Sequence, residues 1–246
     1  MVRTSYDAGV EILGLQLDIV WEEKGANLAK IRHLLTAANP KPRTLVVLPE
    51  MCLTGFTMAD IEDTGESLAE LSKGIRILAG IKRNNRNEAV LFENGREVAR
   101  YAKIHSFKFA GENVVAGTEP VVVDCGEFKL APAICYDLRF PELFRACVWR
   151  GANLFAVIAN WPTERLDHWL TLLKARAIEN QAYVIGVNRC GRDPNFEYPG
   201  HSQVVNPSGE VLTEAGEDEG FVKAELDLLE LQTCRQKFPV LKDHAR

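Results

Sequence analysis

Residues 131–142 read Ala-Pro-Ala-Ile-Cys-Tyr-Asp-Leu-Arg-Phe-Pro-Glu, and this stretch predicts a buried strand that delivers a cysteine to a turn. The apolar run ends at Cys135, polar and charged residues follow at once, and Pro141 is well placed to open a helix. Backbone N–H groups and the helix dipole at such a turn favour a thiolate and can stabilise an oxyanion. The alternative is a buried structural cysteine, which is the commoner fate of a lone cysteine that closes an apolar run.

The composition excludes several classes of function. The 246 residues are 46% hydrophobic and 26% charged, as in ordinary globular proteins, and the net charge of −5 argues against a nucleic-acid partner. No apolar stretch reaches the roughly 18 residues of a membrane span, and residues 1–9 lack the basic and apolar regions of a signal peptide. We therefore expect a cytoplasmic protein that binds neither nucleic acid nor a membrane.

The six cysteines are scattered through mostly apolar surroundings and form no Cys-x-x-Cys pair: Cys52, Cys125, Cys135, Cys147, Cys190 and Cys234. This spacing supports neither a structural zinc site nor a thioredoxin-type motif. We expect reduced thiols, of which Cys135 has a chemical role and the other five pack in the interior.

The hydrophobic pattern predicts strands that alternate with helices. The strands are expected over 11–17, 44–48, 88–93, 96–102, 121–124, 128–134, 154–159, 183–187, 202–205, 210–213 and 220–226. The helices are expected over 24–38, 67–81, 141–150 and 166–182. Hairpin turns are expected at Asn94-Gly95 and at 206–209, and no linker or repeat divides the chain. The pattern predicts an α/β fold of two mixed sheets with outer helices, in a single domain over residues 1–246.

Three buried strands end in residues with reactive side chains. Glu50 follows the strand over 44–48, Lys103 follows the strand over 96–102, and Cys135 follows the strand over 128–134. Because strand ends gather functional groups in α/β folds, a carboxylate, an amine and a thiol are expected in one pocket. Taken singly, Glu50 reads equally as a solvated or helix-capping carboxylate, and Lys103 as a surface lysine.

With their neighbours, these residues resemble the signatures of the nitrilase superfamily of carbon–nitrogen hydrolases. The signatures read Leu-Pro-Glu around Glu50, Tyr-Ala-Lys-Ile-His around Lys103 and Cys-Tyr-Asp-Leu-Arg-Phe-Pro-Glu from Cys135. The resemblance continues through 156–162, 168–189 and 200–211, where the chain is most similar to the bacterial ω-amidases that hydrolyse 2-oxoglutaramate and 2-oxosuccinamate.

The resemblance implies an αββα four-layer sandwich that pairs into a homodimer. It implies a catalytic triad of Glu50, Lys103 and Cys135, and a second glutamate in the loop after the lysine, where Glu112 falls. The implied substrate is a small amide, and no metal or organic cofactor is required.

Amide hydrolysis assigns each residue a task. Cys135 would attack the carboxamide carbon while Glu50 acts as general base. The Lys103 ammonium and the backbone N–H of Tyr136 would hold the oxyanion, and Glu112 would orient Lys103. Ammonia would leave, and water would then release the acid from a cysteine thioester.

Candidates for the substrate pocket are Tyr136, Arg139, Asn160 and Trp161. Arg139 would touch the substrate or pair with Glu142, and a substrate carboxylate would need Arg139 or Arg189. Asn160 and Trp161 end a buried strand, although Trp161 reads almost as well as a core residue. On the helix over 166–182, residues Arg176, Glu179 and Asn180 are expected to stabilise the fold.

Other interpretations of the sequence remain open. His105 would pair with Cys135 as in cysteine proteases, although no Asn or Asp orienter is evident, and His168 and His201 read as structural rather than metal-ligating. An N-carbamoyl-amine hydrolase or a nitrile hydrolase would use the same triad, and a catalytically idle binding protein or a redox sensor would share the fold. The passage 79–87 is short and polar where family members carry a Gly-rich strand and loop, which puts the pocket's shape in doubt.

Overall fold

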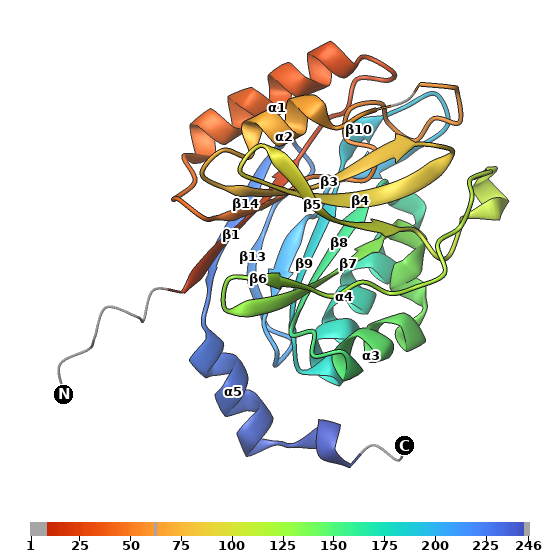
Figure 1. The fold of residues 1–246 in the computed structure, drawn as a ribbon. Helices are drawn as coiled ribbons and strands as arrows, with labels where there is room; N and C mark the ends of the chain where they lie inside the picture. Colours follow the sequence, from red (N-terminus) through yellow and green to blue (C-terminus); the bar gives the residue numbers. More distant parts are fainter. Residues whose placement is uncertain (1–8, 62, 244–246) are drawn as a thin grey trace.

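Two six-stranded mixed sheets pack face to face, with helices on both outer sides (Figure 1). This computed structural model describes residues 9–61 and 63–243, so residues 1–8, on which the signal-peptide argument largely rests, lie outside the described part. The layers follow the order helix, sheet, sheet, helix. The expected αββα sandwich of two mixed sheets is therefore confirmed.

The first sheet contains the strands of the N-terminal half and the last strand of the chain. Across the sheet they are β14 (Gly220–Leu226), β1 (Val10–Gln16), β2 (Leu45–Val47), β3 (Arg76–Arg83), β4 (Arg86–Glu93) and β5 (Arg96–Ala102). Strands β1, β2 and β3 run parallel, whereas β14, β4 and β5 pair antiparallel with their neighbours. Helices α1 (Lys24–Ala38) and α2 (Glu66–Leu71) cover the outer face.

The second sheet has parallel strands at its centre. Its order is β13 (Val211–Glu214), β12 (Gln203–Val205), β9 (Tyr183–Asn188), β8 (Leu154–Ala159), β7 (Phe128–Ile134) and β6 (Val123–Cys125). Strands β7, β8 and β9 are parallel, and α3 (Pro141–Trp149) and α4 (Leu166–Asn180) cover the outer face. The pairing brings the carboxyl ends of these strands to one edge of the sandwich.

Three elements have no counterpart in the sequence analysis. Strands β10 (Cys190–Arg192) and β11 (Glu197–Pro199) form a separate two-stranded ribbon, and α5 (Leu228–Lys237) extends beyond the sandwich (Figure 1). Short strands such as β10 and β11 carry too few residues to show a period in the sequence.

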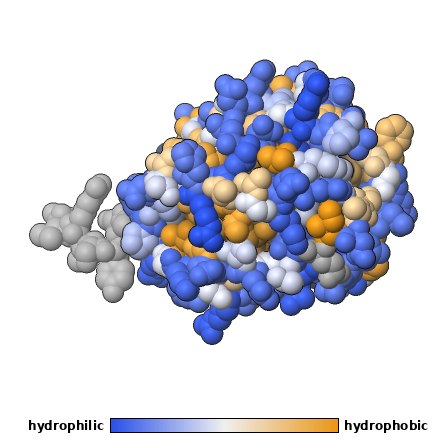
Figure 2. All heavy atoms as spheres, turned by 90° about the horizontal axis from the view of Figure 1, so that it is seen from above, coloured by the Kyte–Doolittle hydropathy of each residue, from blue (hydrophilic) through white to orange (hydrophobic). Residues whose placement is uncertain are grey.

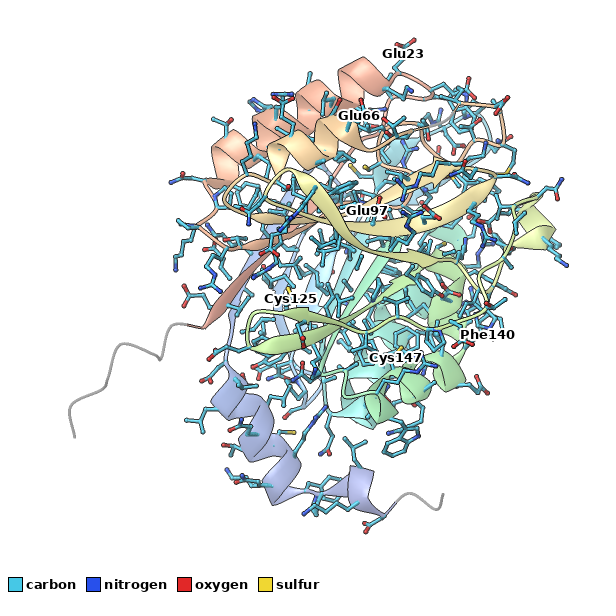
Figure 3. The ribbon with its side chains drawn as sticks, in the orientation of Figure 1. Glu23, Glu66, Glu97, Cys125, Phe140 and Cys147 are labelled. Carbon is cyan, nitrogen blue, oxygen red and sulfur yellow. The ribbon has the colours of Figure 1, made fainter. Side chains whose placement is uncertain are left out.

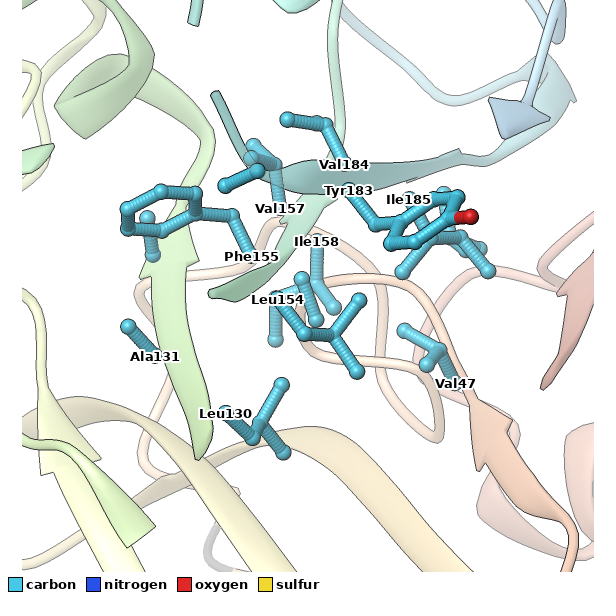
Figure 4. Close-up of a cluster of buried hydrophobic side chains, with 14 of the residues drawn as sticks. Val47, Leu130, Ala131, Leu154, Phe155, Val157, Ile158, Tyr183, Val184 and Ile185 are labelled. Atoms are coloured by element: carbon cyan, nitrogen blue, oxygen red, sulfur yellow. The ribbon is translucent and has the colours of Figure 1, made fainter. Parts of the chain in front are cut away.

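Apolar side chains fill the layer between the sheets (Figure 4). Leu130, Leu154 and Tyr183 stand in register on β7, β8 and β9, and all three are completely buried. Val47 reaches them from β2 of the first sheet. The continuous apolar run over residues 154–159 is typical of a strand that is covered on both faces.

The predicted helix over 67–81 is wrong in its second half. Helix α2 ends at Leu71, and the chain turns at Gly74, whose φ of 85° suits glycine, before it enters β3. Residues 76–82 are all buried. Periodicity alone cannot assign a short, continuously apolar run to helix or strand, and the pairing of this run with β2 and β4 decides for strand.

The polar passage over 79–87 forms the end of β3, a turn at Asn84–Asn85 and the start of β4. Both turn asparagines have positive φ, as a tight hairpin requires. Strand β3 lies so close to the segment over 49–51 that a Cβ at Gly80 would stand 2.4 Å from the Cα of Glu50. Because residue 80 is a glycine, β3 can lie directly against the backbone of Glu50. The Cys52 N–H then donates a hydrogen bond to the Gly80 carbonyl (2.9 Å), which holds the segment around Glu50 on β3.

The helical layer over the first sheet presents a mostly hydrophilic surface with separate apolar spots (Figure 2). Helix α1 buries Ile31 and Leu34 against the sheet and leaves its other side to solvent. Within residues 9–61 and 63–243, no helix is both long and apolar enough to cross a membrane.

Candidate active site

The three reactive residues at strand ends come together at one edge of the sandwich. Glu50 follows β2, Lys103 follows β5, and Cys135 follows β7, so that each sheet contributes to the site. The side chains of Glu50 and Lys103 are completely buried, and Lys103 Nζ lies 2.9 Å from Glu50 Oε1. The juxtaposition expected from the sequence is present.

Glu112 also reaches Lys103. Its Oε2 and Oε1 lie 2.9 Å and 3.1 Å from Lys103 Nζ, and its side chain is completely buried. The carboxylate closes its own loop, because the Phe107 N–H donates to Glu112 Oε2 (2.5 Å) and the Glu112 N–H donates to the Phe107 carbonyl (3.3 Å). The Lys103 ammonium thus makes three hydrogen bonds to two carboxylates, as many as it has N–H bonds.

Asn87 joins the two glutamates and was not among the residues predicted from sequence. Its Nδ2 donates to Glu50 Oε1 (2.7 Å) and to Glu112 Oε1 (2.8 Å) from the start of β4. It lies in the polar passage over 79–87, and the polarity of that passage was the only signal in the sequence that pointed to it.

Asn160 holds Glu50 from the second sheet. Its backbone N–H donates to Glu50 Oε2 (2.9 Å), and its side-chain Nδ2 donates to the Glu50 carbonyl (2.9 Å). Its own carbonyl lies 3.8 Å from Cys135 Sγ. The side chain expected in the pocket wall is therefore hydrogen-bonded to Glu50, and the backbone carbonyl of Asn160 is the group that contacts the thiol.

Cys135 stands at a sharp elbow between β7 and the short helix η2 (Cys135–Arg139). Its φ of 46° lies in the left-handed region, which costs a non-glycine residue about 1–2 kcal/mol. The buried carboxylate of Asp137 holds the elbow: its Oδ2 accepts hydrogen bonds from the Ile134 N–H (3.0 Å) and the Tyr101 hydroxyl (2.8 Å). Asp137 also accepts a bond from the His105 N–H (3.0 Å), so it ties the elbow to the segment after Lys103.

Charges and burial act in opposite directions on the site's pKa values. Burial raises the pKa of the Cys135 thiol well above its usual value, and Glu50 raises it further, although Lys103 opposes both. Burial by itself would lower the pKa of Lys103, but the charges of Glu50, Cys135 and Glu112 raise it overall. The resting pair is therefore a thiol and an ammonium, which contradicts the expectation that the turn favours a thiolate. The five-residue η2 offers too small a dipole to offset burial.

His105 has the carboxylate partner that the sequence did not reveal. Its Nδ1 lies 2.8 Å from Asp137 Oδ1, and its ring stacks on Phe140 at 3.7 Å between centroids (Phe140 is labelled in Figure 3). No hydrogen bond joins His105 to Cys135 in the part of the chain that the structure describes. A cysteine–histidine pair of the protease type is therefore not assembled.

A narrow pocket opens onto the thiol. It is lined by Phe107, Cys135, Tyr136, Arg139, Trp161, Pro162 and Arg165. The Arg139 guanidinium lies 4.7 Å from the Trp161 ring centroid, and the Arg165 guanidinium lies 5.6 Å from that of Phe107. Burial lowers the pKa of Arg139, and the positive charge of Arg165 lowers it further, so the two cations share the mouth of the pocket. Arg165 was not predicted from sequence.

The remaining candidates lie outside the pocket. Arg189 is completely buried, donates to the carbonyls of Ile19 (2.9 Å) and Cys190 (3.0 Å) and packs over a tyrosine ring. Glu142 is exposed at the start of α3, and Arg139 instead lies 3.3 Å from the Nδ1 of His168. These contacts make Arg189 structural and leave Arg139 as the cation available to a substrate.

The other residues expected to stabilise the fold do so. Arg176 donates from α4 to the carbonyl of Leu138 in η2 (3.0 Å) and to Glu179 (2.7 Å). His201 lies 2.7 Å from Glu214. Cys125 and Cys147 lie apart, in β6 and α3 (Figure 3), and burial raises the pKa of these thiols to about 11 and about 12.

The chain is similar to known proteins over nearly its whole length. Residues 14–236 match the carbon–nitrogen hydrolase family. A 2-oxoglutaramate amidase of Bacillus subtilis (strain 168) is 35% identical over 93% of this chain and 95% of that protein. The omega-amidase YafV of Escherichia coli (strain K12) is 37% identical over 96% of each chain.

Solved structures show the same architecture. XC1258 of Xanthomonas campestris, a CN-hydrolase superfamily protein with an arsenic adduct in its active site, superimposes with a TM-score of 0.89 at 29% identity and covers 97% of this chain and 98% of that one. Saccharomyces cerevisiae Nit3, a member of branch 10 of the nitrilase superfamily, gives a TM-score of 0.84 at 27% identity over 96% of each chain. Because the family match spans nearly the whole chain and two relatives exceed 30% identity over more than nine tenths of it, the protein belongs to the carbon–nitrogen hydrolase family.

Proposed function

We propose that the protein is an ω-amidase that hydrolyses the terminal carboxamide of a small 2-oxo acid, 2-oxoglutaramate or 2-oxosuccinamate, to the carboxylic acid and ammonia. The observation that carries the proposal is the buried cluster of Glu50, Lys103 and Glu112 beside the Cys135 thiol. The relatives named 2-oxoglutaramate amidase and omega-amidase support the choice of substrate.

The first half of the reaction forms a thioester and releases ammonia. Cys135 Sγ attacks the carboxamide carbon as Glu50 takes the thiol proton, because the buried thiol has too high a pKa to ionise alone. The Lys103 ammonium, with the N–H that it turns from one Glu112 oxygen to the substrate, and the backbone N–H of Tyr136 hold the oxyanion. One such donor lowers a barrier by about 3 kcal/mol. Glu50 then passes its proton to the leaving nitrogen, and the C–N bond breaks.

The second half restores the enzyme. Water loses a proton to Glu50 and attacks the thioester carbon, and the same two donors hold the second oxyanion. The C–S bond breaks, the thiolate recovers the proton from Glu50, and the carboxylic acid leaves. Glu112 fixes Lys103 through its two short contacts.

The substrate's own carboxylate would bind at the mouth of the pocket. Arg139 and Arg165 place two guanidinium groups there, and a guanidinium recognises a carboxylate through paired N–H donors. Tyr136 and Trp161 support Arg139 with their ring faces and narrow the space for the acyl chain. An amide without a carboxylate would lack this anchor.

Ammonia release tests the proposal. The purified protein is assayed with 2-oxoglutaramate, glutamine, N-carbamoyl-β-alanine and a simple nitrile, and the 2-oxo acid amide should give the highest kcat/KM. Cys135→Ala should release no ammonia, whereas Cys147→Ala, which changes a buried cysteine in α3, should stay active. A marked preference for the carbamoyl substrate would overturn the assignment, and so would an active Cys135→Ala variant.

We also propose that the chain acts as one catalytic domain in a cytoplasmic homodimer. The site needs residues from both sheets, which supports a single domain. Trp149 of α3, Ile178 of α4 and Leu229 of α5 expose 51%, 54% and 69% of their surfaces, and such side chains suit an interface between two copies. Free cysteines suit a reducing compartment. Light scattering that gives the mass of one chain would contradict the dimer.

A further inference from the structure

Among the described residues, Asn87 is the one side chain that contacts both glutamates of the cluster without carrying a charge. It is 1% exposed, and its backbone carbonyl accepts a hydrogen bond from the Lys103 N–H (2.9 Å). This backbone hydrogen bond fixes Asn87 and Lys103 relative to each other, independently of the contacts of their side chains. The Nδ2 atom then lies 2.7 Å from Glu50 Oε1 and 2.8 Å from Glu112 Oε1.

The chemistry of the three groups determines how the amide is oriented. An ionised carboxylate only accepts hydrogen bonds, so the NH2 end of Asn87 must face Glu50 and Glu112. Its two N–H bonds match the two carboxylates, one each. The Oδ1 atom accepts no hydrogen bond from the described residues. A buried acceptor without a donor destabilises a fold, so this asparagine serves the cluster at the expense of stability.

The cluster needs such a donor because its charges do not balance. Glu50 and Glu112 carry two negative charges, and Lys103 supplies one positive charge. Around them stand the Cys135 thiol, the Tyr198 phenol of β11 and Lys82 of β3, which lies opposite Asn87 in the sheet. Lys82 is turned away, since its Nζ donates to the Ala59 carbonyl (2.6 Å). The Asn160 N–H donates to Glu50 alone and the Phe107 N–H to Glu112 alone, whereas Asn87 is a neutral group that donates to both and so stabilises the excess negative charge where the two carboxylates meet.

We propose that Asn87 is a positioning residue that holds Glu50 and Glu112 at a fixed separation and orientation, so that one accepts the proton of the thiol while the other holds Lys103. The inference rests on the proposed amide hydrolysis. It adds a fourth element of the chain, the start of β4, to the machinery provided by the loops after β2, β5 and β7.

Asn87→Leu removes both donors at nearly constant volume. The value of kcat/KM at pH 7 should fall by about tenfold to a hundredfold, the equivalent of one hydrogen bond to a charged group. Because the two carboxylates lose their common donor and move relative to the thiol and Lys103, the loss should fall on kcat, and KM should change less than about twofold.

Two further variants separate positioning from packing. Asn87→Asp keeps the shape but adds a third carboxylate that repels Glu50 and Glu112, so it should lower kcat further and decides the question if Asn87→Leu does not fold. Leu91→Val is the matched control, because Leu91 lies four residues along β4 on the same face and is buried. It should lower the melting temperature and leave kcat within about twofold of the wild-type value. A folded Asn87→Leu or Asn87→Asp with the wild-type kcat overturns the proposal.

A measurement without turnover separates this inference from the choice of substrate. The rate at which iodoacetamide alkylates Cys135 at pH 9, measured by mass spectrometry, reports how readily the thiolate forms beside the cluster. In Asn87→Leu the negative charge of the two carboxylates is no longer offset by the amide N–H groups. Alkylation of Cys135 should therefore slow severalfold relative to the wild type and to Leu91→Val. If the wild type releases no ammonia from 2-oxoglutaramate, the ω-amidase assignment fails, and this rate still decides the role of Asn87. Equal rates in all three proteins overturn that role.

Discussion

The apolar layer between the sheets and the polar cluster at the strand ends lie next to each other, and both are shielded from water. In the apolar layer, side chains such as Leu154 stabilise the fold as they leave solvent. In the cluster, burial of Glu50, Lys103 and Glu112 costs desolvation that their mutual contacts must repay. The comparison shows that burial in the apolar layer stabilises the fold, and that this stability offsets the cost of holding buried charges in the neighbouring cluster.

The cluster departs from low-energy structure in further ways. Cys135 has a left-handed backbone, and the Oδ1 atoms of Asn87 and Asn160 accept no hydrogen bond from the described residues. These features lie within a few residues of the strand ends and not in the layer. If the contrast is correct, substitutions in the two regions must separate activity from stability.

Lys103→Met tests the contrast with the largest expected effect. It removes an oxyanion donor and leaves two buried carboxylates without their cation. We expect kcat/KM to fall at least about a thousandfold and the free energy of unfolding to fall by about 3–5 kcal/mol. Assays of ammonia release and urea denaturation measure both. Retention of a tenth of the activity would show that Lys103 does not hold the oxyanion.

Leu154→Ala should lower the free energy of unfolding by a similar amount, but it changes the apolar layer alone. The cavity should lower the free energy of unfolding by about 3–5 kcal/mol, because Leu154 is completely buried between neighbours in β7 and β9. Activity per folded molecule should stay within about twofold of the wild type, since Leu154 is the first residue of β8 and the site lies beyond the strand's other end. A large loss of kcat in fully folded protein would break the contrast between the two regions.

Asp137→Asn tests the elbow, which lies between the two regions. In the wild type the donors are divided between two carboxylate oxygens, whereas the amide offers them one acceptor oxygen. We therefore expect the free energy of unfolding to fall by about 1–3 kcal/mol. The thiol should also become less well placed, so that kcat falls about tenfold while KM changes little. Steady-state kinetics on folded protein separates the two constants. A change in KM alone would mean that Asp137 supports the pocket and not the nucleophile.

The smallest expected effect compares two inactive variants at the elbow. Cys135→Gly should be about 1 kcal/mol more stable than Cys135→Ala, because glycine adopts a φ of 46° without a penalty and alanine does not. Thermal unfolding of the two proteins gives the difference directly. If the alanine variant proves equally stable, the elbow stores no backbone strain.

The residues that the sequence identified share one property. Glu50, Lys103 and Cys135 each follow directly on a buried strand, and strand ends are visible in the hydrophobic pattern. Asp137 lies within the stretch that decides the fold, yet its partners Tyr101 and His105 are more than 30 residues away along the chain. Its role therefore depends on tertiary packing and could not be read from local pattern.

Asn87 and the state of the thiol escaped prediction for related reasons. Asn87 begins a strand in a polar passage, and its two partners lie 37 and 25 residues distant. The thiolate expected at Cys135 followed from its turn, whereas its actual pKa follows from burial and from Glu50, which the opposite sheet supplies. The helix expected over 67–81 failed because sheet pairing outweighed local periodicity.

The hydrogen bonds between Asn160 and Glu50 join the two sheets at the site itself. Glu50 and Lys103 belong to one sheet and Cys135 to the other, so neither sheet alone contains a working set of residues. During refolding, the return of secondary structure and the return of turnover are therefore separate events. Turnover reports the moment at which the two sheets dock in register, which makes this active site a kinetic probe of the last step of assembly.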